Sequence, residues 1–269
     1  MVVVTYNNVS TIERCLASVP PWVTLTVVDN ASTDGTPVFG ERNPVNVGFS
    51  AAVNQAASRG KGDYILLLNP DAYLHEGALE QLLALAARFP SAGVYGGRAV
   101  DGSGRLDPST CLARPSWWHA LAFATGTSTV VDPDSLGRWR RDDVRDVPAL
   151  TGSMFLVRRD LWEKLGGFDE GYWMYGEDVD LCMRAAKTGA RPMFTPLAVH
   201  THVGGGSSTR SERLVGILRG KARLYEVYVG KGARYALMVG VALRAVVSRR
   251  WRAAWRDRAR WQHGRSVAG

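Results

Sequence analysis

Strands and helices alternate along the first hundred residues, and each strand runs into a cluster of polar residues. The strands appear as short apolar runs, whereas the helices carry apolar stripes or start at a turn signal, such as Ser10-x-x-Glu13 with the spacing of a capping box. A chain of this pattern folds into a parallel sheet with helices on both faces. We therefore predict an α/β fold with a doubly wound, mostly parallel sheet. Strands are expected at 2–4, 23–28, 64–68 and 154–157, and helices at 10–19, 50–58, 76–89, 160–165 and 177–187.

The composition allows a large core, since 46% of the 269 residues are hydrophobic and 22% are charged. Fibrous and low-complexity proteins are thereby excluded. Cys15, Cys111 and Cys182 are far apart and never in C-x-x-C spacing, which argues against a disulfide framework or a structural zinc site. No secretory signal follows Met1, and no apolar run approaches the roughly 20 residues that span a membrane. A reducing, cytoplasmic location is expected.

Polar side chains follow three successive predicted strands. In parallel sheets, ligands bind beyond the carboxyl ends of the strands, so residues distant in sequence should meet there in one crevice. The polar residues at these ends are Thr5 and Asn7, then Asp29, Asn30 and Asp34, then Asn69 and Asp71.

Asn69-Pro70-Asp71 comes directly after a buried strand. A carboxylate there can hold a divalent cation, which in turn can bridge the two phosphates of a nucleotide diphosphate. The alternative is an ordinary turn, because Asn-Pro is a common turn dipeptide.

A second acidic cluster, Glu177, Asp178 and Asp180, opens a predicted helix. Acids in a first turn can simply complement the helix dipole. However, the cluster follows the aromatic residues Trp173 and Tyr175, which would form a poorly solvated wall. Such a wall raises the proton affinity of a carboxylate, as a general base requires.

His200 and His202 lie two residues apart on an extended segment and so point to the same face. If the strand ends at His200, only His202 reaches past its tip. The alternative is that both histidines are structural and that the glycine run 204–206 is a flexible joint.

Taken together, these motifs resemble the inverting nucleotide-sugar glycosyltransferases of family 2, which have the Rossmann-like GT-A fold. Within that family the chain is most similar to bacterial rhamnosyltransferases that act on lipid-linked acceptors in cell-wall or surface-polysaccharide synthesis. The resemblance covers residues 1 to about 208, and it rests on the segments 4–7, 28–34, 46–49 with Asn54, 68–71, 166–170 and 177–180, in this order.

The resemblance implies a role for each matching residue. Asp178 matches the catalytic base, and Glu177 beside it helps to shape the acceptor site. Asp71 matches the metal- and diphosphate-binding acid, and His202 lies where relatives place a histidine near the metal or the departing diphosphate, with His200 as the alternative. The donor nucleotide is expected at Thr5, Tyr6, Asn7, Asp29, Asn30, Asp34, Asn46, Gly48 and Asn69, and the acceptor at Gly152, Trp173 and Tyr175.

The implied cofactor is Mg²⁺ or Mn²⁺, and the implied partners are a nucleotide-sugar donor and a lipid-linked or glycan acceptor. The acceptor hydroxyl, deprotonated by Asp178, attacks the anomeric carbon in one displacement, so the configuration inverts. L-rhamnose from dTDP-rhamnose is the preferred donor, with UDP-galactofuranose, UDP-N-acetylglucosamine and GDP-mannose as alternatives. The chain departs from the family in having one carboxylate in its metal motif and a short stretch between Asp34 and Asn46, which leaves open whether a strand lies there.

The last sixty residues are strongly basic. Residues 210–269 contain 15 Lys and Arg against 3 Asp and Glu, whereas residues 1–209 contain 18 against 22. We predict a catalytic domain at 1–208, with a nucleotide-sugar half at 1–100 and an acceptor half at 101–208, followed by a basic helical tail at 209–269.

In the tail, one helical face carries Leu243, Val247, Trp251 and Trp255, and another carries arginines. This pattern predicts an interfacial helix that holds the enzyme on an anionic membrane, at the inner face of the plasma membrane. The alternative is a helix packed on the catalytic domain. A nucleic-acid-binding tail is the alternative from another class, but it leaves the acidic strand ends unexplained, so no nucleic acid is expected.

Overall fold

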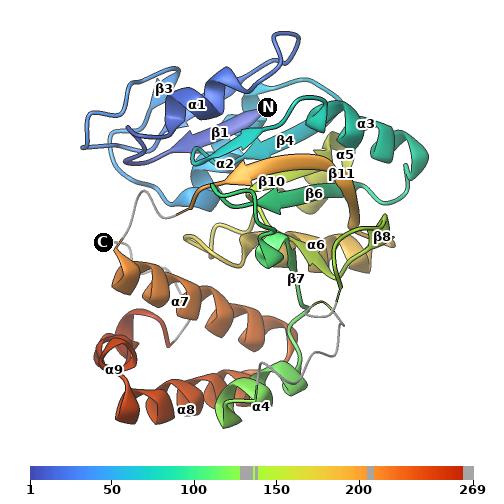
Figure 1. The fold of residues 1–269 in the computed structure, drawn as a ribbon. Coiled ribbons are helices and arrows are strands. Elements are labelled where there is room, and N and C mark those ends of the chain that lie inside the picture. Colours follow the sequence, from blue (N-terminus) through green and yellow to red (C-terminus); the bar gives the residue numbers. More distant parts are fainter. Residues whose placement is uncertain (128–135, 137–138, 205–208, 263–269) are drawn as a thin grey trace. The chain divides into compact units, whose positions relative to one another are not determined.

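The structure is a computed structural model that describes residues 1–127, 136, 139–204 and 209–262. The chain divides into two compact units (Figure 1). Unit 1 comprises Met1–Leu112, Trp139–Asp169 and Asp178–Ser207, and unit 2 comprises Ala113–Arg138, Glu170–Glu177 and Ser208–Gly269.

In the described residues, unit 1 is built on a nine-stranded sheet with the order β3-β2-β1-β4-β10-β6-β11-β5, and β8 pairs with β11. The pairs β3-β2, β2-β1, β1-β4 and β6-β11 are parallel, as predicted, but β10, β5 and β8 run antiparallel to their neighbours. The strands are β1 (Val2–Thr5), β2 (Thr26–Asp29), β3 (Glu41–Arg42), β4 (Tyr64–Leu68), β5 (Ala72–Leu74), β6 (Val94–Val100), β8 (Arg145–Asp146), β10 (Met154–Arg158) and β11 (Met193–His202). A two-stranded sheet joins β7 (Cys111–Leu112) to β9 (Ala149–Leu150).

Helices cover this sheet because each has one apolar stripe. In α3, the buried residues Leu79, Leu82, Leu85 and Ala86 recur at helical spacing and join the main hydrophobic cluster of the unit. The helices of unit 1 are α1 (Ile12–Ala17), α2 (Phe49–Arg59), α3 (Ala78–Arg88), α5 (Arg159–Leu165) and α6 (Glu177–Lys187), with a 3-10 turn at Pro108–Thr110. Glu177, the first residue of α6, is grouped with unit 2.

The predicted capping box at Ser10 and Glu13 is wrong. Helix α1 begins one residue later, with Thr11 as its N-cap and no side-chain hydrogen bond at the cap. A capping box is present instead at the start of α7. There the hydroxyl of Thr209 accepts the N–H of Glu212, and the carboxylate of Glu212 accepts the N–H of Thr209. The short stretch between Asp34 and Asn46 does contain a strand, the two-residue β3.

Gly97 lets β6 and β11 approach each other next to β10. A Cβ atom at this position would overlap the carbonyl oxygen of Ala198 and would lie 2.5 Å from Cε of Met154. The parallel register of these strands shifts nearby, between Thr195 and Val199.

We expect Gly97→Ala to lower the free energy of unfolding by about 1–3 kcal/mol, because the added methyl group overpacks this contact. The measurement is urea denaturation followed by circular dichroism. Gly102→Ala is the matched control, since a Cβ at Gly102 has no atom within 4 Å. Equal midpoints for the two variants would contradict the packing argument.

Unit 2 is helical around its own core. Its helices are α4 (Trp117–Thr125), α7 (Arg210–Tyr228), α8 (Lys231–Val247) and α9 (Arg249–Arg256), followed by a 3-10 turn at Arg258–Arg260. Ala120 of α4 shares one hydrophobic cluster with residues of α7 and α8, and Trp261 is fully buried in it. The basic tail therefore shares a core with α4, which the predicted boundaries placed in the acceptor half.

The predicted helix that would carry Leu243, Val247, Trp251 and Trp255 on one face is also corrected. Ser248 adopts an extended conformation (φ −129°, ψ 126°) and separates α8 from α9. Leu243 and Val247 are 57% and 82% exposed, whereas Trp251 and Trp255 pack against the core of unit 2. These four residues therefore do not form one exposed face. Among the described residues, the helices are too short or too polar to cross a membrane.

Candidate functional site

The carboxyl ends of β1, β2, β4 and β11 lie at one edge of the sheet, together with the amino end of β10. The register sets this arrangement, since Thr5 pairs with Asp29 in parallel and Met154 pairs with Leu68 in antiparallel orientation. The N–H of Asn69 donates to the carbonyl of Ser153 at 3.1 Å. The strand ends identified in the sequence are thus brought to the same edge.

Thr5 and Asp29 are buried side by side at this edge. The hydroxyl of Thr5 donates to Oδ1 of Asn8 at 3.3 Å, and the N–H of Tyr6 donates to the same oxygen at 3.0 Å. Asp29 forms an ion pair with Arg42 of β3, 3.3 Å from Nε. Arg42 could not be predicted from the sequence, because only the pairing of β3 with β2 brings it to Asp29.

Asn7 and Asp34 connect the loops that follow β1 and β2. Asn7 has a left-handed backbone (φ 55°), and its side-chain oxygen accepts the N–H of Thr33 at 2.8 Å. Its own N–H donates to the hydroxyl of Ser32 at 2.9 Å. Asp34 accepts the N–H of Val9 at 3.0 Å. These bonds order the two loops as one unit before any ligand binds.

Asn30 organises the next loop from within. Its amide nitrogen donates to Oδ1 of Asn46 at 2.9 Å and to the carbonyl of Gly48 at 3.2 Å. Its amide oxygen accepts from Asn43 and from the N–H of Val47, each at 3.1 Å. Asn30 is therefore a buried support for the segment 43–48, which leads into α2.

Asp71 and His202 are brought together by the pairing of β5 with β11, in which His202 lies opposite Ala72. Nε2 of His202 is 3.4 Å from Oδ1 of Asp71, and Nδ1 is 3.8 Å from Oδ2 of Asp107. Burial lowers the pKa of His202, but the nearby carboxylates of Asp107 and Asp71 outweigh it and raise the pKa to about 9. The side chain of His202 thus lies between two carboxylates.

His200 has a different environment. It is fully buried, and its Nε2 lies 3.0 Å from the hydroxyl of Ser153. Burial lowers the pKa of His200 to about 3, so the ring is neutral at physiological pH. The structure therefore places His202, and not His200, beside Asp71.

Asp107 was not identified from the sequence. It precedes the Pro108–Thr110 turn, where its side chain also accepts the N–H of Ser109 at 2.8 Å. The imidazole of His202 beside it holds the pKa of Asp107 well below its usual value. In the sequence, Asp107-Pro108-Ser109 indicates only that Asp107 caps the turn that follows. The contact with His202 is therefore visible only in the folded structure.

The Asp71–His202 pair fits a divalent cation that a diphosphate also binds. It offers one carboxylate and one imidazole, and a carboxylate on the far ring nitrogen is the arrangement that orients metal-binding histidines. No group of three or more His, Cys, Asp or Glu residues suited to a metal occurs in the described part of the chain. With two protein ligands, the remaining ones would have to come from the diphosphate and water.

Asp178, the second residue of α6, is buried next to the segment before β10. Its Oδ2 accepts the N–H of Gly152 at 3.0 Å, and its Oδ1 accepts the N–H of Val179 at 2.7 Å. Burial raises the pKa of Asp178, although these N–H groups oppose the shift. The raised pKa is the property that a general base needs.

The other two acids of the cluster have different surroundings. Asp180 pairs with Arg184 one turn later, at 2.7 Å, and Arg184 donates to the carbonyls of Leu165 and Gly167. Asp180 therefore holds Arg184, which in turn anchors the preceding loop to α6. Glu177 is buried at the first position of the helix.

The aromatic residues expected at the acceptor belong to unit 2. Tyr175 has a left-handed backbone (φ 71°) and packs along α7, where Gly216 and Gly220 leave room for it. A Cβ at Gly220 would overlap the carbonyl oxygen of Tyr175. Trp173 is half-buried in the same segment. Gly216 and Gly220, four residues apart in α7, are the sequence signal that could have indicated this close packing.

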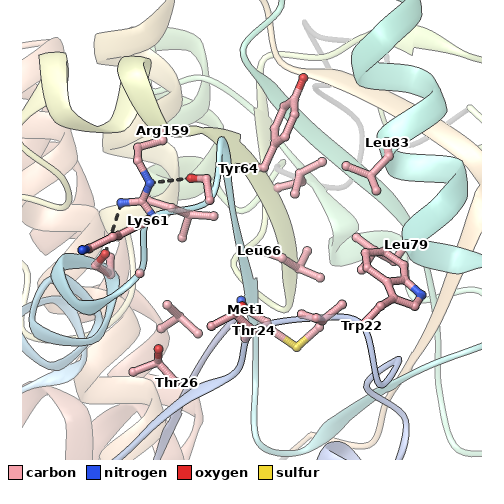
Figure 2. Close-up of a pocket in the computed structure, with 17 residues that line it drawn as sticks. Met1, Trp22, Thr24, Thr26, Lys61, Tyr64, Leu66, Leu79, Leu83 and Arg159 are labelled. Atoms are coloured by element: carbon pink, nitrogen blue, oxygen red, sulfur yellow. Dashed lines mark hydrogen bonds between the residues drawn. The ribbon is translucent and has the colours of Figure 1, made fainter.

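A pocket of about 210 Å³ lies at the opposite edge of the sheet, at the amino ends of the strands (Figure 2). Its lining is mostly apolar, with Trp22, Leu79 and Leu83 on one side. Arg159 lies on the other side and donates to the carbonyls of Gly62 and Ala57. This pocket contains none of the strand-end residues described above.

Two protein families match the chain. The family described as "Glycosyl transferase family 2" matches residues 1–166, and that described as "N-terminal domain of galactosyltransferase" matches residues 144–204. The N-acetylglucosaminyl-diphospho-decaprenol L-rhamnosyltransferase of Mycobacterium tuberculosis (strain ATCC 25618 / H37Rv) is 33% identical over 231 residues, which is 75% of each chain. Rhamnosyltransferase WbbL of Escherichia coli (strain K12) is 30% identical over 172 residues, or 60% of each chain.

Solved structures share the fold at low sequence identity. GalNAc-T7 with UDP, GalNAc and Mn²⁺ superposes with a TM-score of 0.63 and 17% identity, over 87% of this chain and 48% of that one. The mannosyltransferase PcManGT from Pyrobaculum calidifontis, in complex with GDP-Man and Mn²⁺, gives 0.57 and 16%, over 98% and 84%. These similarities confirm the predicted α/β fold.

Proposed function

Because the chain belongs to glycosyltransferase family 2 and has the GT-A fold, we propose that it transfers L-rhamnose from dTDP-rhamnose to a hydroxyl of a lipid-linked or polysaccharide acceptor, with inversion. The two relatives described above support this choice of sugar, since both are named as rhamnosyltransferases. The mycobacterial name also supports a lipid diphosphate acceptor. The reaction would serve cell-wall or surface-glycan synthesis.

One observation carries the assignment of the site. A backbone hydrogen bond from Asn69 to Ser153 connects the turn that contains Asp71 to the segment before β10. In the same segment, the N–H of Gly152 donates to the carboxylate of Asp178. A candidate base and a candidate diphosphate-binding acid are thus fixed to adjacent strands of one sheet edge. A one-step displacement needs this juxtaposition, because the attacking hydroxyl and the leaving diphosphate must lie on opposite sides of one carbon atom.

The donor nucleotide would lie over the loops after β1 and β2. In this proposal Thr5, Tyr6, Asn7, Asp29 and Asp34 line the nucleoside site, while Asn30, Asn46 and Gly48 shape the adjoining loop. The hydrogen bonds that already connect these loops reduce the entropy lost on binding. Asn69 would contribute at the diphosphate end.

Asp71 and His202 would hold a divalent cation, with Asp107 orienting the imidazole of His202. Bound Mg²⁺ or Mn²⁺ would neutralise charge on the diphosphate leaving group. Asp71 contributes the carboxylate, and His202 contributes a ring nitrogen whose orientation is set through the opposite nitrogen. The Mn²⁺ in the two structural neighbours supports this class of metal.

Asp178 would take the proton from the acceptor hydroxyl. The N–H groups of Gly152 and Val179 fix both of its oxygens, so the carboxylate keeps its orientation while an acceptor approaches. Gly152 would leave room for that approach, and Glu177, Trp173 and Tyr175 would shape the acceptor site. Each of these roles is part of the proposal.

The proposal is tested with a panel of nucleotides in a thermal-shift assay. The panel contains dTDP-rhamnose, dTDP, UDP-N-acetylglucosamine, UDP-galactofuranose and GDP-mannose, with and without Mg²⁺ or Mn²⁺. At a hundred times Kd, a ligand that binds only the folded state adds about 2.7 kcal/mol to its stability. We expect metal-dependent stabilisation by the two dTDP compounds, and product formation from dTDP-rhamnose and a polyprenyl-diphosphate glycan. A response to a UDP or GDP sugar alone would overturn the choice of donor.

A further inference from the structure

The outer face of α8 is apolar although it is exposed. Tyr235, Val239, Leu243 and Val246 recur at intervals of four, four and three residues and are all more than half exposed, with Val246 at 75%. The inner face of the same helix, which includes Leu237 and Val241, is buried in the core of unit 2. A helix with one face on a core normally turns polar residues to water. Here the water-facing side is apolar over about 17 Å, at 1.5 Å per residue.

Helix α4 extends this apolar surface. The two helices pack side by side in unit 2 (Figure 1). A Cβ at Gly232 would lie 2.6 Å from the ring of Trp117, so that ring covers the first turn of α8. Trp118 and Leu121 of α4 are also exposed, Trp118 at 68%. We call the seven residues the α4–α8 face: Trp117, Trp118, Leu121, Tyr235, Val239, Leu243 and Val246.

The charged residues within α8 and α9 are all basic. From Val227 to Arg256 the chain contains seven Lys and Arg and no Asp or Glu. Lys231 lies at the start of α8, and Arg249 and Arg250 follow its end, all three exposed. Exposed apolar and aromatic side chains with basic residues at the borders are the features of a helix that lies in a membrane interface.

We propose that the α4–α8 face binds the surface of an anionic lipid bilayer, with α8 parallel to the membrane plane. The apolar side chains would enter the region between headgroups and acyl chains, and the basic residues would contact lipid phosphates. A second copy of the chain is a poorer occupant, because a symmetric interface would bring identical basic borders together. The proposal concerns attachment and does not depend on which sugar is transferred.

The test is co-sedimentation of the full chain with vesicles of phosphatidylcholine, with and without 30% phosphatidylglycerol, at two salt concentrations. We expect binding to the anionic vesicles that weakens at high salt. The double variant Val239→Glu, Val246→Glu should lower the partition coefficient at least tenfold, because it places charge in the apolar contact. Leu197→Glu is the matched control: Leu197 is 63% exposed, lies in unit 1, and should leave binding unchanged.

Two further measurements make the outcome decisive. Thermal unfolding of the double variant checks that it folds. A second variant, Arg249→Gln with Arg250→Gln, measures the electrostatic contribution: its partition coefficient should fall on anionic vesicles and stay unchanged on phosphatidylcholine alone. Equal partitioning of wild type and double variant would overturn the proposal. So would a concentration-dependent dimer, detected by analytical ultracentrifugation, that the double variant abolishes while vesicle binding persists. Nucleotide binding is measured in parallel, so that a failure of the proposed transferase function can be told apart from a failure of membrane binding.

Discussion

Asp178→Asn is expected to lower the turnover number by about 10²–10⁴-fold, the range for removing a general base. The amide cannot accept the proton of the acceptor hydroxyl, although its shape nearly matches the carboxylate. Binding of the nucleotide should change little, because Asp178 contacts the backbone of Gly152 and Val179 and no residue of the loops after β1 and β2. The measurement is steady-state transfer, with nucleotide affinity determined by calorimetry. Wild-type turnover in the variant would exclude Asp178 as the base.

The pH dependence gives a second readout for the same residue. Because burial raises the pKa of Asp178, activity should fall on the acid side at a higher pH than for an ordinary aspartate. The sign for stability is also defined: a carboxyl whose folded pKa is raised contributes to stability at low pH, and that contribution is lost as the pH rises through the folded pKa. In the Asp178→Asn variant, which has no carboxyl group at this position, this fall in stability with rising pH should be absent. Unfolding curves at several pH values, compared with wild type, test the prediction.

Asp71→Asn is expected to abolish the metal-dependent part of nucleotide diphosphate binding and to reduce turnover by about 10²–10³-fold, the usual effect of losing one group that stabilises developing charge. Asp71 is the single carboxylate of the Asn-Pro-Asp turn, so no neighbouring acid in that turn can replace it. Binding of Mn²⁺ by electron paramagnetic resonance, without acceptor, separates this effect from catalysis.

Asp107→Asn should also weaken Mn²⁺ binding, but less than Asp71→Asn does. Asp107 contacts the far nitrogen of His202, and removing such an orienting partner weakens metal affinity by about 10–100-fold. Asp146→Asn is the control, since Asp146 is exposed and pairs with Met193 at the other end of β11. If Asp71→Asn and the control bind Mn²⁺ equally, the assignment of the metal site is wrong.

Several elements could be predicted because their signals are local. The helix at 177–187 and the strand at 64–68 have the predicted bounds, since the strand is a continuous apolar run that stops at Asn69-Pro70-Asp71 and the helix begins at an acidic cluster and ends before Gly189. The prediction was poorest where two signals compete. Ser10 and Glu13 have the spacing of a capping box, yet Thr11 caps the helix. β5 directly follows the Asn-Pro-Asp turn and is recognisable only through its pairing with β11.

Local sequence patterns were sufficient to predict the α/β class, the family and the residues at the strand ends, because hydrophobic period and residue order are properties of neighbouring positions. The three-dimensional fold was needed to show which histidine meets Asp71, that Asp107 lies beside His202, and that Arg184, paired with Asp180, contacts the loop before α6. It also decided that Trp251 and Trp255 face inward while α8 exposes an apolar face. The physical reason is that strand register and helix packing bring together residues distant in sequence, and helical periodicity does not specify whether an apolar face meets a core or the solvent.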